Sequence, residues 1–225
     1  MKMFVATVAA ALMVAPAFAK DDTAKRLRAA TEDLNAMMNA GDKGIPEDLL
    51  NKATCVAVVP NLKAGGFIVG GEYGKGFFTC RKRSGVGWSS PGAIRISGGK
   101  FGLLIGGKET DVIMLVMNDS GMQHLLSDKF ELGGEASAAA GPIGRTASAM
   151  TDAEMHAEIL TYSRSRGIFG GLDLSGSAIT SDKDSIKALY GQDMTNKDIL
   201  DSASLKTPPE ARPFIHTLNR DSSRK

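Results

Sequence analysis

Two short runs of basic residues at expected turns are the residues best suited to chemistry in this sequence. One is Arg81-Lys82-Arg83 and the other is Arg164-Ser165-Arg166-Gly167. A guanidinium fork binds two phosphate oxygens at once, and hydroxyl groups and open glycine amides add further donors. The two turns therefore indicate a site for an anionic ligand, although most charged runs of this kind are only solvated surface.

A third group of cations lies on an expected helix over 20–39. Leu27, Leu34 and other apolar residues recur there at spacings of three and four, which is the pattern of one buried helix face. Lys25, Arg26 and Arg28 occupy the other faces. Such a helix either lies on an anionic membrane or packs on its own domain with its charges in solvent. The second interpretation is the more common one.

Motifs for catalysis and for cofactors are missing from the sequence. The run from Gly102 to Lys108 has the glycine and lysine spacing of a phosphate-binding loop, but Glu109 follows where Ser or Thr would hold magnesium. There is no Gly-x-Gly-x-x-Gly, no Gly-x-Ser-x-Gly and no metal-ligand spacing of His or Cys. The acid pair Asp182 and Asp184 lies in polar sequence and is expected to be solvated. We therefore expect a protein that is not an enzyme and needs no cofactor or metal.

The N-terminus has the three parts of an export signal. A lysine at position 2 precedes the apolar run from Phe4 to Val14, and Ala17-Phe18-Ala19 supplies a small-x-small cleavage site. The alternative is a membrane anchor, but the run is shorter than the roughly 20 residues that span a bilayer. We expect cleavage after residue 19 and a periplasmic or secreted protein.

The cysteines and the charge balance bear on the expected disulfide and on the expected partners. Cys55 and Cys80 are a candidate disulfide in an exported protein, and two buried thiols are the alternative. The chain has 27 Lys and Arg against 25 Asp and Glu, and removal of residues 1–19 takes one lysine and no acid. A near-neutral balance argues against nucleic acid as a partner.

The middle of the chain predicts many short strands. Its 26 glycines lie mostly among Val, Ile, Phe and Leu, which is typical of strands joined by tight turns. We expect the strand from Cys55 to stop at Pro60-Asn61, and Gly98-Gly99 to form a hairpin turn. Segments 158–164 and 170–179 are expected to form a final hairpin. Helices are expected at 45–53, 121–128, 183–190, 196–203 and 210–218.

These elements indicate an α+β fold. The close spacing of the strands favours antiparallel pairing over βαβ units. The expected core is a mostly antiparallel, Gly-rich β-sheet or barrel-like structure, with flanking amphipathic helices at both ends.

Six motifs, in their order along the chain, resemble a known family. They are Val58–Phe67, Gly70–Gly76, Gly87–Pro91, Gly106–Val112, Ala140–Arg145 and Tyr162–Gly171. Together they are similar to the SYLF domain, a lipid-binding domain also found in eukaryotic actin-patch regulators. The resemblance covers roughly residues 25–218. It implies one SYLF-like domain over 20–225 after a signal peptide over 1–19, in an exported, bacterial-type branch of the family.

The resemblance implies binding rather than catalysis. Eukaryotic members bind phosphoinositide membranes, and some bind actin filaments and carry an added Src-homology module. For this chain the implied function is binding of anionic lipid or phosphoinositide-like headgroups at a membrane surface, with the protein peripherally attached. Actin is not expected as a partner because of the export signal. The alternative is an envelope protein-interaction or structural domain without a lipid ligand.

The residues proposed for the lipid are the basic ones described above. The Tyr162–Gly171 motif matches the family without gaps, and the basic helix resembles the segment through which eukaryotic members touch membranes. The proposed lipid-binding residues are Arg164, Arg166, Arg81, Lys82, Arg83, Lys25, Arg26 and Arg28.

Overall fold

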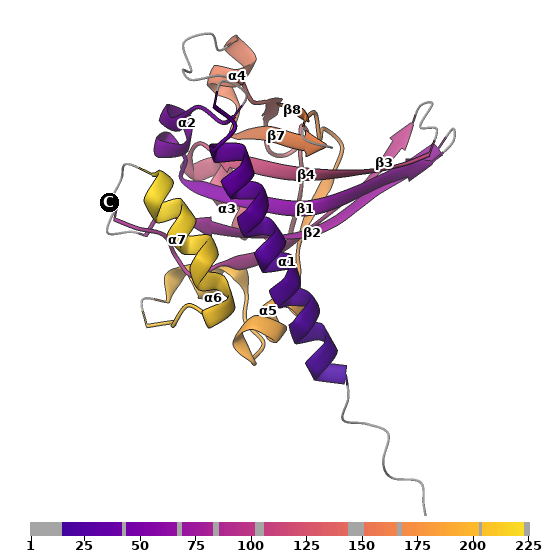
Figure 1. Ribbon diagram of the computed structural model, residues 1–225. Helices are drawn as coiled ribbons and strands as arrows, with labels where there is room; N and C mark the ends of the chain where they lie inside the picture. Colours follow the sequence, from indigo (N-terminus) through magenta and orange to yellow (C-terminus); the bar gives the residue numbers. More distant parts are fainter. Residues whose placement is uncertain are drawn as a thin grey trace, which may run out of the picture.

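The computed structural model describes residues 15–41, 44–66, 69–82, 86–101, 106–143, 151–165, 168–202 and 204–222. Within these residues a single curled sheet forms the centre of the molecule, with helices packed against it (Figure 1). The expected α+β class, with a mostly antiparallel sheet and helices from both ends of the chain, is confirmed.

The sheet has nine strands in the order β5-β9-β3-β2-β1-β4-β7-β6 in the described part of the chain, with β8 paired to β7. Every pairing is antiparallel except that of β6 with β7. The strands are β1 (Cys55–Gly66), β2 (Val69–Cys80), β3 (Gly92–Phe101), β4 (Gly106–Val116), β5 (Lys129–Glu131), β6 (Ala138–Ala140), β7 (Ile159–Ser165), β8 (Ile168–Gly171) and β9 (Ala178–Ser181).

Both faces of the sheet are covered, which explains the apolar runs of the central strands, such as 55–59 in β1 and 112–116 in β4. In β1, Val56 and Val58 belong to the core on the helical side, whereas Ala57 and Val59 belong to the core on the opposite side. This alternation follows from the two-residue period of a strand. A strand that is buried on both faces has no polar positions in its sequence.

The helices divide between the two faces. The helical side is covered by α1, α2 and the C-terminal helices, and α1 crosses it diagonally with α7 alongside (Figure 1). The short helix α3 packs on the other side. The helices are α1 (Ala15–Met38), α2 (Glu47–Lys52), α3 (Asp119–Leu126), α4 (Asp152–His156), α5 (Lys183–Tyr190), α6 (Asn196–Asp201), the 3₁₀ turn η3 (Pro209–Ala211) and α7 (Arg212–Asp221).

The buried face of α1 is the one that its spacing predicts. Leu27, Ala30, Leu34 and Met37 are all at most 2% exposed and join the core on the helical side. The export signal falls largely on residues 1–14, which lie outside the described residues, and α1 begins at Ala15.

The two cysteines are direct cross-strand partners. Cys55 opposes Cys80 in the β1–β2 register, and their sulfur atoms form a disulfide with the Cα atoms 3.9 Å apart. The bond joins the start of β1 to the end of β2.

Two expected turns are strand in the structure. β1 continues past Pro60-Asn61 to Gly66, because a bulge between Val59 and Leu62 absorbs the irregularity. Asn61 takes φ 51°, a left-handed conformation that asparagine tolerates. Gly98 and Gly99 pair with Glu72 and Gly71 inside β3, so the expectation of a hairpin turn there was wrong.

The expected final hairpin is half correct. β7 pairs with β8 as expected, but β9 lies between β3 and β5, near the opposite edge of the sheet. Local patterns locate strands, whereas the choice of partner depends on packing far along the chain.

Candidate functional site

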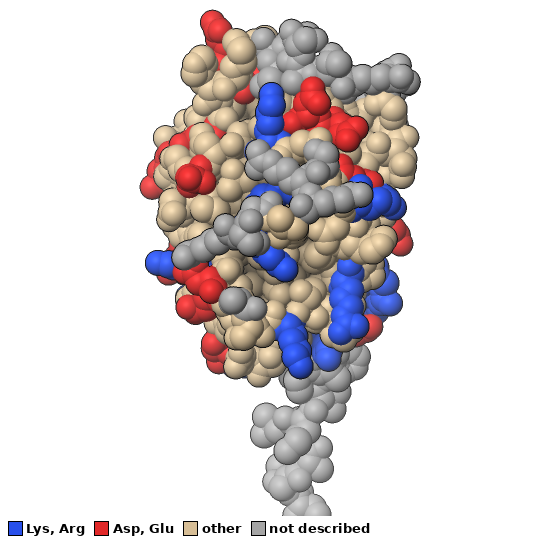
Figure 2. All heavy atoms as spheres, turned by 90° about the vertical axis from the view of Figure 1, so that its left-hand side faces the viewer, with Lys and Arg blue, Asp and Glu red and all other residues tan. Residues whose placement is uncertain are grey.

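Basic side chains concentrate on particular parts of the surface. Figure 2 shows one face, on which Lys and Arg gather toward the lower end while Asp and Glu lie mostly toward the upper part and the left-hand edge. Four basic residues, Lys20, Lys25, Arg26 and Arg28, lie within nine residues of α1.

A groove runs between α1 and the neighbouring elements. It consists of two cavities of about 500 and 800 Å³, and Arg26 and Lys75 line both. The smaller cavity, between α1 and strands β1 and β2, is also lined by Lys25, Lys63, Asn61 and Tyr73. The larger one, between α1 and α5, adds Lys20 and Lys187 but also Asp22 and Asp184. We call the two together the α1 groove.

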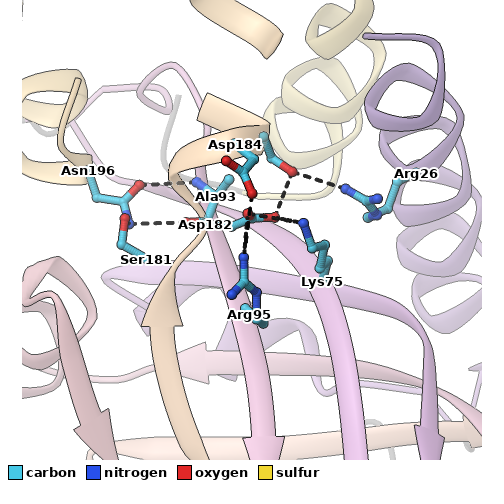
Figure 3. Close-up of polar contacts among 9 residues, drawn as sticks. Arg26, Lys75, Ala93, Arg95, Ser181, Asp182, Asp184 and Asn196 are labelled. Carbon is cyan, nitrogen blue, oxygen red and sulfur yellow. Dashed lines mark hydrogen bonds and ion pairs between the residues drawn. The ribbon is translucent and has the colours of Figure 1, made fainter. Parts of the chain in front are cut away.

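One buried carboxylate positions the cations at the centre of the groove. Asp182, immediately before α5, is fully buried, and its oxygens lie 3.0 Å from Lys75 Nζ and 3.1 Å from an Arg95 nitrogen (Figure 3). Ser185 Oγ donates a hydrogen bond to Asp182 and accepts one from Arg26 at 3.1 Å. Arg26 of α1 is thereby connected to the carboxylate that holds Lys75 of β2 and Arg95 of β3.

The cluster keeps Asp182 ionised. Burial alone would raise the pKa of the Asp182 carboxyl, but hydrogen bonds from Ser185 and Lys75 and the charges of Lys75 and Arg95 outweigh burial and hold the pKa below its ordinary value. The cluster therefore has two cations for one fully buried anion, and the exposed Asp184 carboxylate also lies 3.9 Å from Arg95 (Figure 3). Of the two cations, Lys75 lines both cavities of the groove.

Asp182 is the residue that sequence reasoning missed. The expectation that Asp182 and Asp184 are both solvated is wrong for Asp182, whereas the Asp184 side chain is indeed 86% exposed. A usable signal was the presence of Lys75 and Arg95 inside otherwise glycine-rich and apolar strands. A cation at such a position needs a partner from another element.

Arg164 has a different environment. Its Nε donates to Asp111 of β4 at 3.0 Å, and a terminal nitrogen donates to Asp33 of α1 at 2.9 Å. Asp33 is only 5% exposed. Arg164 therefore connects α1 to the sheet through two carboxylates. Its guanidinium is bound within the fold in this structure.

Arg81 is also engaged by the fold. Its guanidinium carbon lies 4.0 Å from the centre of the Trp88 ring, and its nitrogens point to the carbonyl oxygens of Leu50 and Ala53 at the end of α2. A cation is stabilised at a helix C-terminus by the helix dipole and over an aromatic face by the ring quadrupole.

The structure brings together only some of the predicted residues. Lys25 and Arg26 meet in the groove, and Arg28 and Lys82 are exposed. Arg81 comes directly after Cys80, which is paired with Cys55, and Cys55 is paired with Val116 at the end of β4. Arg164 is paired with Asp111, which is five residues before Val116 on β4. Five strand residues span roughly 17 Å, so these two arginines are not neighbours. Arg83 and Arg166 lie outside the described residues.

Two further searches cover the described residues. Within the ranges given above, His, Cys, Asp and Glu form no group of three that could hold a metal ion. No helix there is both long enough and apolar enough to cross a membrane.

Comparison with known families identifies the fold's relatives. The model of the family Ysc84, described as Las17-binding protein actin regulator, matches residues 97–221. This match covers more than half of the chain, so the protein belongs to that family. The resemblance to the SYLF domain is thereby confirmed.

Individual relatives come from yeasts and mammals. "Protein YSC84" of Saccharomyces cerevisiae is 34% identical over 180 residues, which are 79% of this chain and 38% of the relative. "LAS seventeen-binding protein 3" of the same species is also 34% identical, over 79% of this chain and 39% of its own length. "SH3 domain-containing YSC84-like protein 1" of Mus musculus is 34% identical over 87% of this chain and 56% of its own. The chain thus spans well under two thirds of these relatives.

Proposed function

We propose that this member of the Ysc84 family binds anionic lipid headgroups, such as phosphoinositide-like ones, at a membrane surface without catalysing a reaction. The α1 groove is the proposed site. The observation that supports this most is the smaller cavity, whose lining includes Lys25, Arg26, Lys63 and Lys75 and, among the described residues, no acid.

The cations of this cavity can turn to a phosphate at small cost. Lys25 pairs with Asp21 and Lys63 with Glu109, but all four side chains are more than half exposed. Exposed ion pairs contribute only about 0–1 kcal/mol. Arg26 contacts the neutral Ser185 hydroxyl, and a guanidinium has five N–H donors.

The charges of the groove contribute to the affinity for an anionic membrane. A basic residue near an anionic surface contributes about 1 kcal/mol, and each 1.4 kcal/mol is about tenfold in affinity. Lys75 is held by Asp182, and the other three residues would strengthen attachment by roughly a hundredfold. Added salt would weaken the attachment, because exposed charges separated by more than the Debye length, about 10 Å at 0.1 M salt, are largely screened.

Vesicle cosedimentation tests the proposal. Binding should be strong to vesicles of acidic lipid, weak to phosphatidylcholine alone, and reduced at high salt. Arg26→Gln should lower the affinity about tenfold, because a bidentate charged contact is lost. Arg28→Gln is the matched control on the same helix. Arg28 is among the lipid-binding residues that the sequence proposes, but it is exposed and lines neither cavity of the groove, so its loss should lower the affinity less than the loss of Arg26, by at most about fivefold.

The outcomes separate three cases. Equal losses from the two variants would mean diffuse attraction to the helix rather than a groove site. If the protein bound acidic and neutral vesicles equally poorly, a protein-interaction role would replace lipid binding. The name of one yeast relative, "LAS seventeen-binding protein 3", and the description of the family as Las17-binding protein actin regulator give that second role its support.

We also propose that the protein is exported. Cleavage after Ala19 would place Lys20, a residue of the larger cavity, at the new N-terminus. N-terminal sequencing of protein from the cell envelope tests this. A chain that still began at Met1 would contradict it.

A further inference from the structure

Three charged side chains from three separate elements meet beneath the middle of α1. Asp33 comes from α1, Asp111 from β4 and Arg164 from β7. The side chains are 7%, 17% and 28% exposed, so water reaches them only in part. The group has two carboxyl groups but one cation.

The hydrogen bonding of this group is incomplete without a proton. Asp33 Oδ1 accepts from Arg164, but the buried Oδ2 of Asp33 has no hydrogen-bond partner. Asp111 accepts from Arg164 and from the backbone N–H of Asn61. The carboxyl groups of Asp33 and Asp111 lie 2.9 and 3.0 Å from the same terminal nitrogen of Arg164, so they are close neighbours, and two carboxylates can only accept. A proton on Asp33 Oδ2 turns one acceptor into a donor and satisfies the orphaned atom.

The charged groups around Asp33 favour the same assignment. Burial, and then the charge and hydrogen bonding of Asp111, raise the pKa of Asp33 to about 7, against the lowering effect of Arg164. Glu32, on α1 itself, also raises it.

Most cations of the other elements packed against α1 have partners of their own, and Lys108 of β4, which is exposed, lines a cavity together with Asp111 and Arg164. Arg220 of α7 pairs with Asp221, Lys75 of β2 pairs with Asp182, and Lys20, at the start of the helix, pairs with Glu210 of η3. Lys63 of β1 pairs with Glu109 of β4, and Ser185 of α5 contacts α1 at Arg26, two helical turns before Asp33.

We propose that Asp33 and Asp111 share one proton and, with Arg164, form a latch that fastens α1 to the sheet while the proton is present and loosens when it leaves. Loss of the proton leaves two buried negative charges on one arginine. Their repulsion is relieved by moving Asp33, and hence α1, away from the sheet. The latch is a switch that responds to pH near neutrality.

The latch regulates the α1 groove, and this consequence rests on the proposed function. Lys25 and Arg26 form the α1 wall of the groove, two turns from Asp33. A loosened helix no longer holds these cations opposite Lys63 and Lys75. Binding to acidic vesicles should therefore weaken as the pH rises from 6 to 8.

The test begins with the protein alone. Carboxyl carbon NMR of the full chain, with Asp33→Asn and Asp111→Asn for assignment, should show a titration of Asp33 with a midpoint near 7. Hydrogen exchange, corrected for intrinsic rates, should show α1 amides around Leu34 losing protection by up to tenfold per pH unit above 7. In Asp33→Asn, whose amide cannot ionise, protection should be the same at pH 6 and 8.

A carboxyl midpoint below 5 would overturn the shared proton. Protection that is independent of pH in the unaltered protein, or equally pH-dependent in Asp33→Asn, would overturn the latch. Vesicle binding at pH 6 and 8 is the separate readout for regulation. If the latch titrates but binding to acidic vesicles is strong and constant, the regulatory consequence is wrong while the proposed function stands. If there is no binding to acidic vesicles at either pH, the proposed function is wrong while the latch stands.

Discussion

Two charge clusters fasten helices to the same sheet, and they have opposite imbalances. Around Asp182, one buried carboxylate serves the two cations Lys75 and Arg95, and a second, exposed carboxylate, Asp184, lies 3.9 Å from Arg95. Around Arg164, one cation serves the two carboxyl groups of Asp33 and Asp111. Both lie under α1 or its contact with α5, and both combine a buried acid with partly exposed arginine.

The imbalance determines what each cluster can do. The positive charges of Lys75 and Arg95 keep Asp182 ionised, and Lys75, together with Arg26, presents positive charge to the α1 groove. A surplus of negative charge in a place that water barely reaches is relieved most simply by taking up a proton. The same residue types therefore suit a ligand site in one cluster and a pH-sensitive contact in the other.

The largest effect should come from removing the cation of the acidic cluster. Arg164→Ala leaves two buried carboxyl groups without a counter-charge, and breaking a buried pair in this way costs about 3–5 kcal/mol. In a domain of this size the melting temperature should fall by roughly 10 °C or more. Thermal unfolding at pH 7 measures it, with Arg28→Ala as the exposed control, which should shift by about 1–2 °C at most.

The opposite outcome would restore the ligand role that the sequence predicts for Arg164. In that case Arg164→Ala would leave the melting temperature unchanged and abolish binding to acidic vesicles. The proposed difference between the two clusters would then be wrong, because the Arg164 cluster would also bind an external anion.

A smaller loss is expected when the buried anion of the basic cluster is neutralised. Asp182→Asn keeps the shape but removes the charge that Lys75 and Arg95 share, and we expect a loss of about 2–3 kcal/mol at pH 7, since both cations can still reach water.

The pH dependence of this second effect has a definite sign. The pKa of Asp182 is lowered in the folded state, so its contribution is present above the ordinary value of 3.8 and is lost as the pH falls through the folded pKa. Urea unfolding of the unaltered protein between pH 5 and pH 2.5 should show this acid-side loss, and Asp182→Asn should show less of it. Identical acid-side slopes would mean that Asp182 is not the titrating group.

The sequence predicted these clusters only in part, and the reason is chain distance. Arg164 and Arg26 are recognisable as basic residues at a turn and on a helix. Their partners are not, because Asp33 is 131 residues from Arg164 and Ser185 is 159 residues from Arg26. Composition near a residue carries no information about a contact made across the sheet.

In the fold, too, local spacing predicts the elements, whereas contacts between distant segments decide how the elements are placed. The apolar face of α1 and the helix over 183–190 follow from spacing, and the structure has both. The placement of β9 beside β3 does not follow from spacing. β1 continues through Pro60-Asn61 by means of a bulge. A bulge adds a residue to one strand, and the alternation of buried and exposed residues along the sequence does not predict it.

The pH dependence of the acidic cluster should have the reverse sign to that of Asp182. The folded-state pKa of Asp33, about 7, lies above its ordinary value of 3.8, so the folded protein binds more protons than the unfolded chain between these values. Stability should therefore fall as the pH rises from 5 to 8, by about 1–2 kcal/mol after allowance for solvent screening. Urea unfolding at these pH values should show the fall, and Asp33→Asn should remove it. A flat profile in the unaltered protein would contradict the sharing of a proton.

The smallest effect is expected at Arg81, which provides a contact of a third kind. Its guanidinium lies on the Trp88 ring and points to carbonyl oxygens at the end of α2, so these contacts are made with an aromatic face and with backbone dipoles. Arg81→Lys keeps the charge but loses the flat stacking surface and the fork of donors. We expect a loss of about 1 kcal/mol. Because Trp88 is the only tryptophan in the chain, its fluorescence and near-ultraviolet circular dichroism report the contact directly. The loss should be equal at pH 5 and pH 8, since none of the groups in this contact titrates in that range. A loss that grew with pH would show that Arg81 depends on a titrating acid, and the difference between charge-imbalanced clusters and this dipolar contact would then disappear.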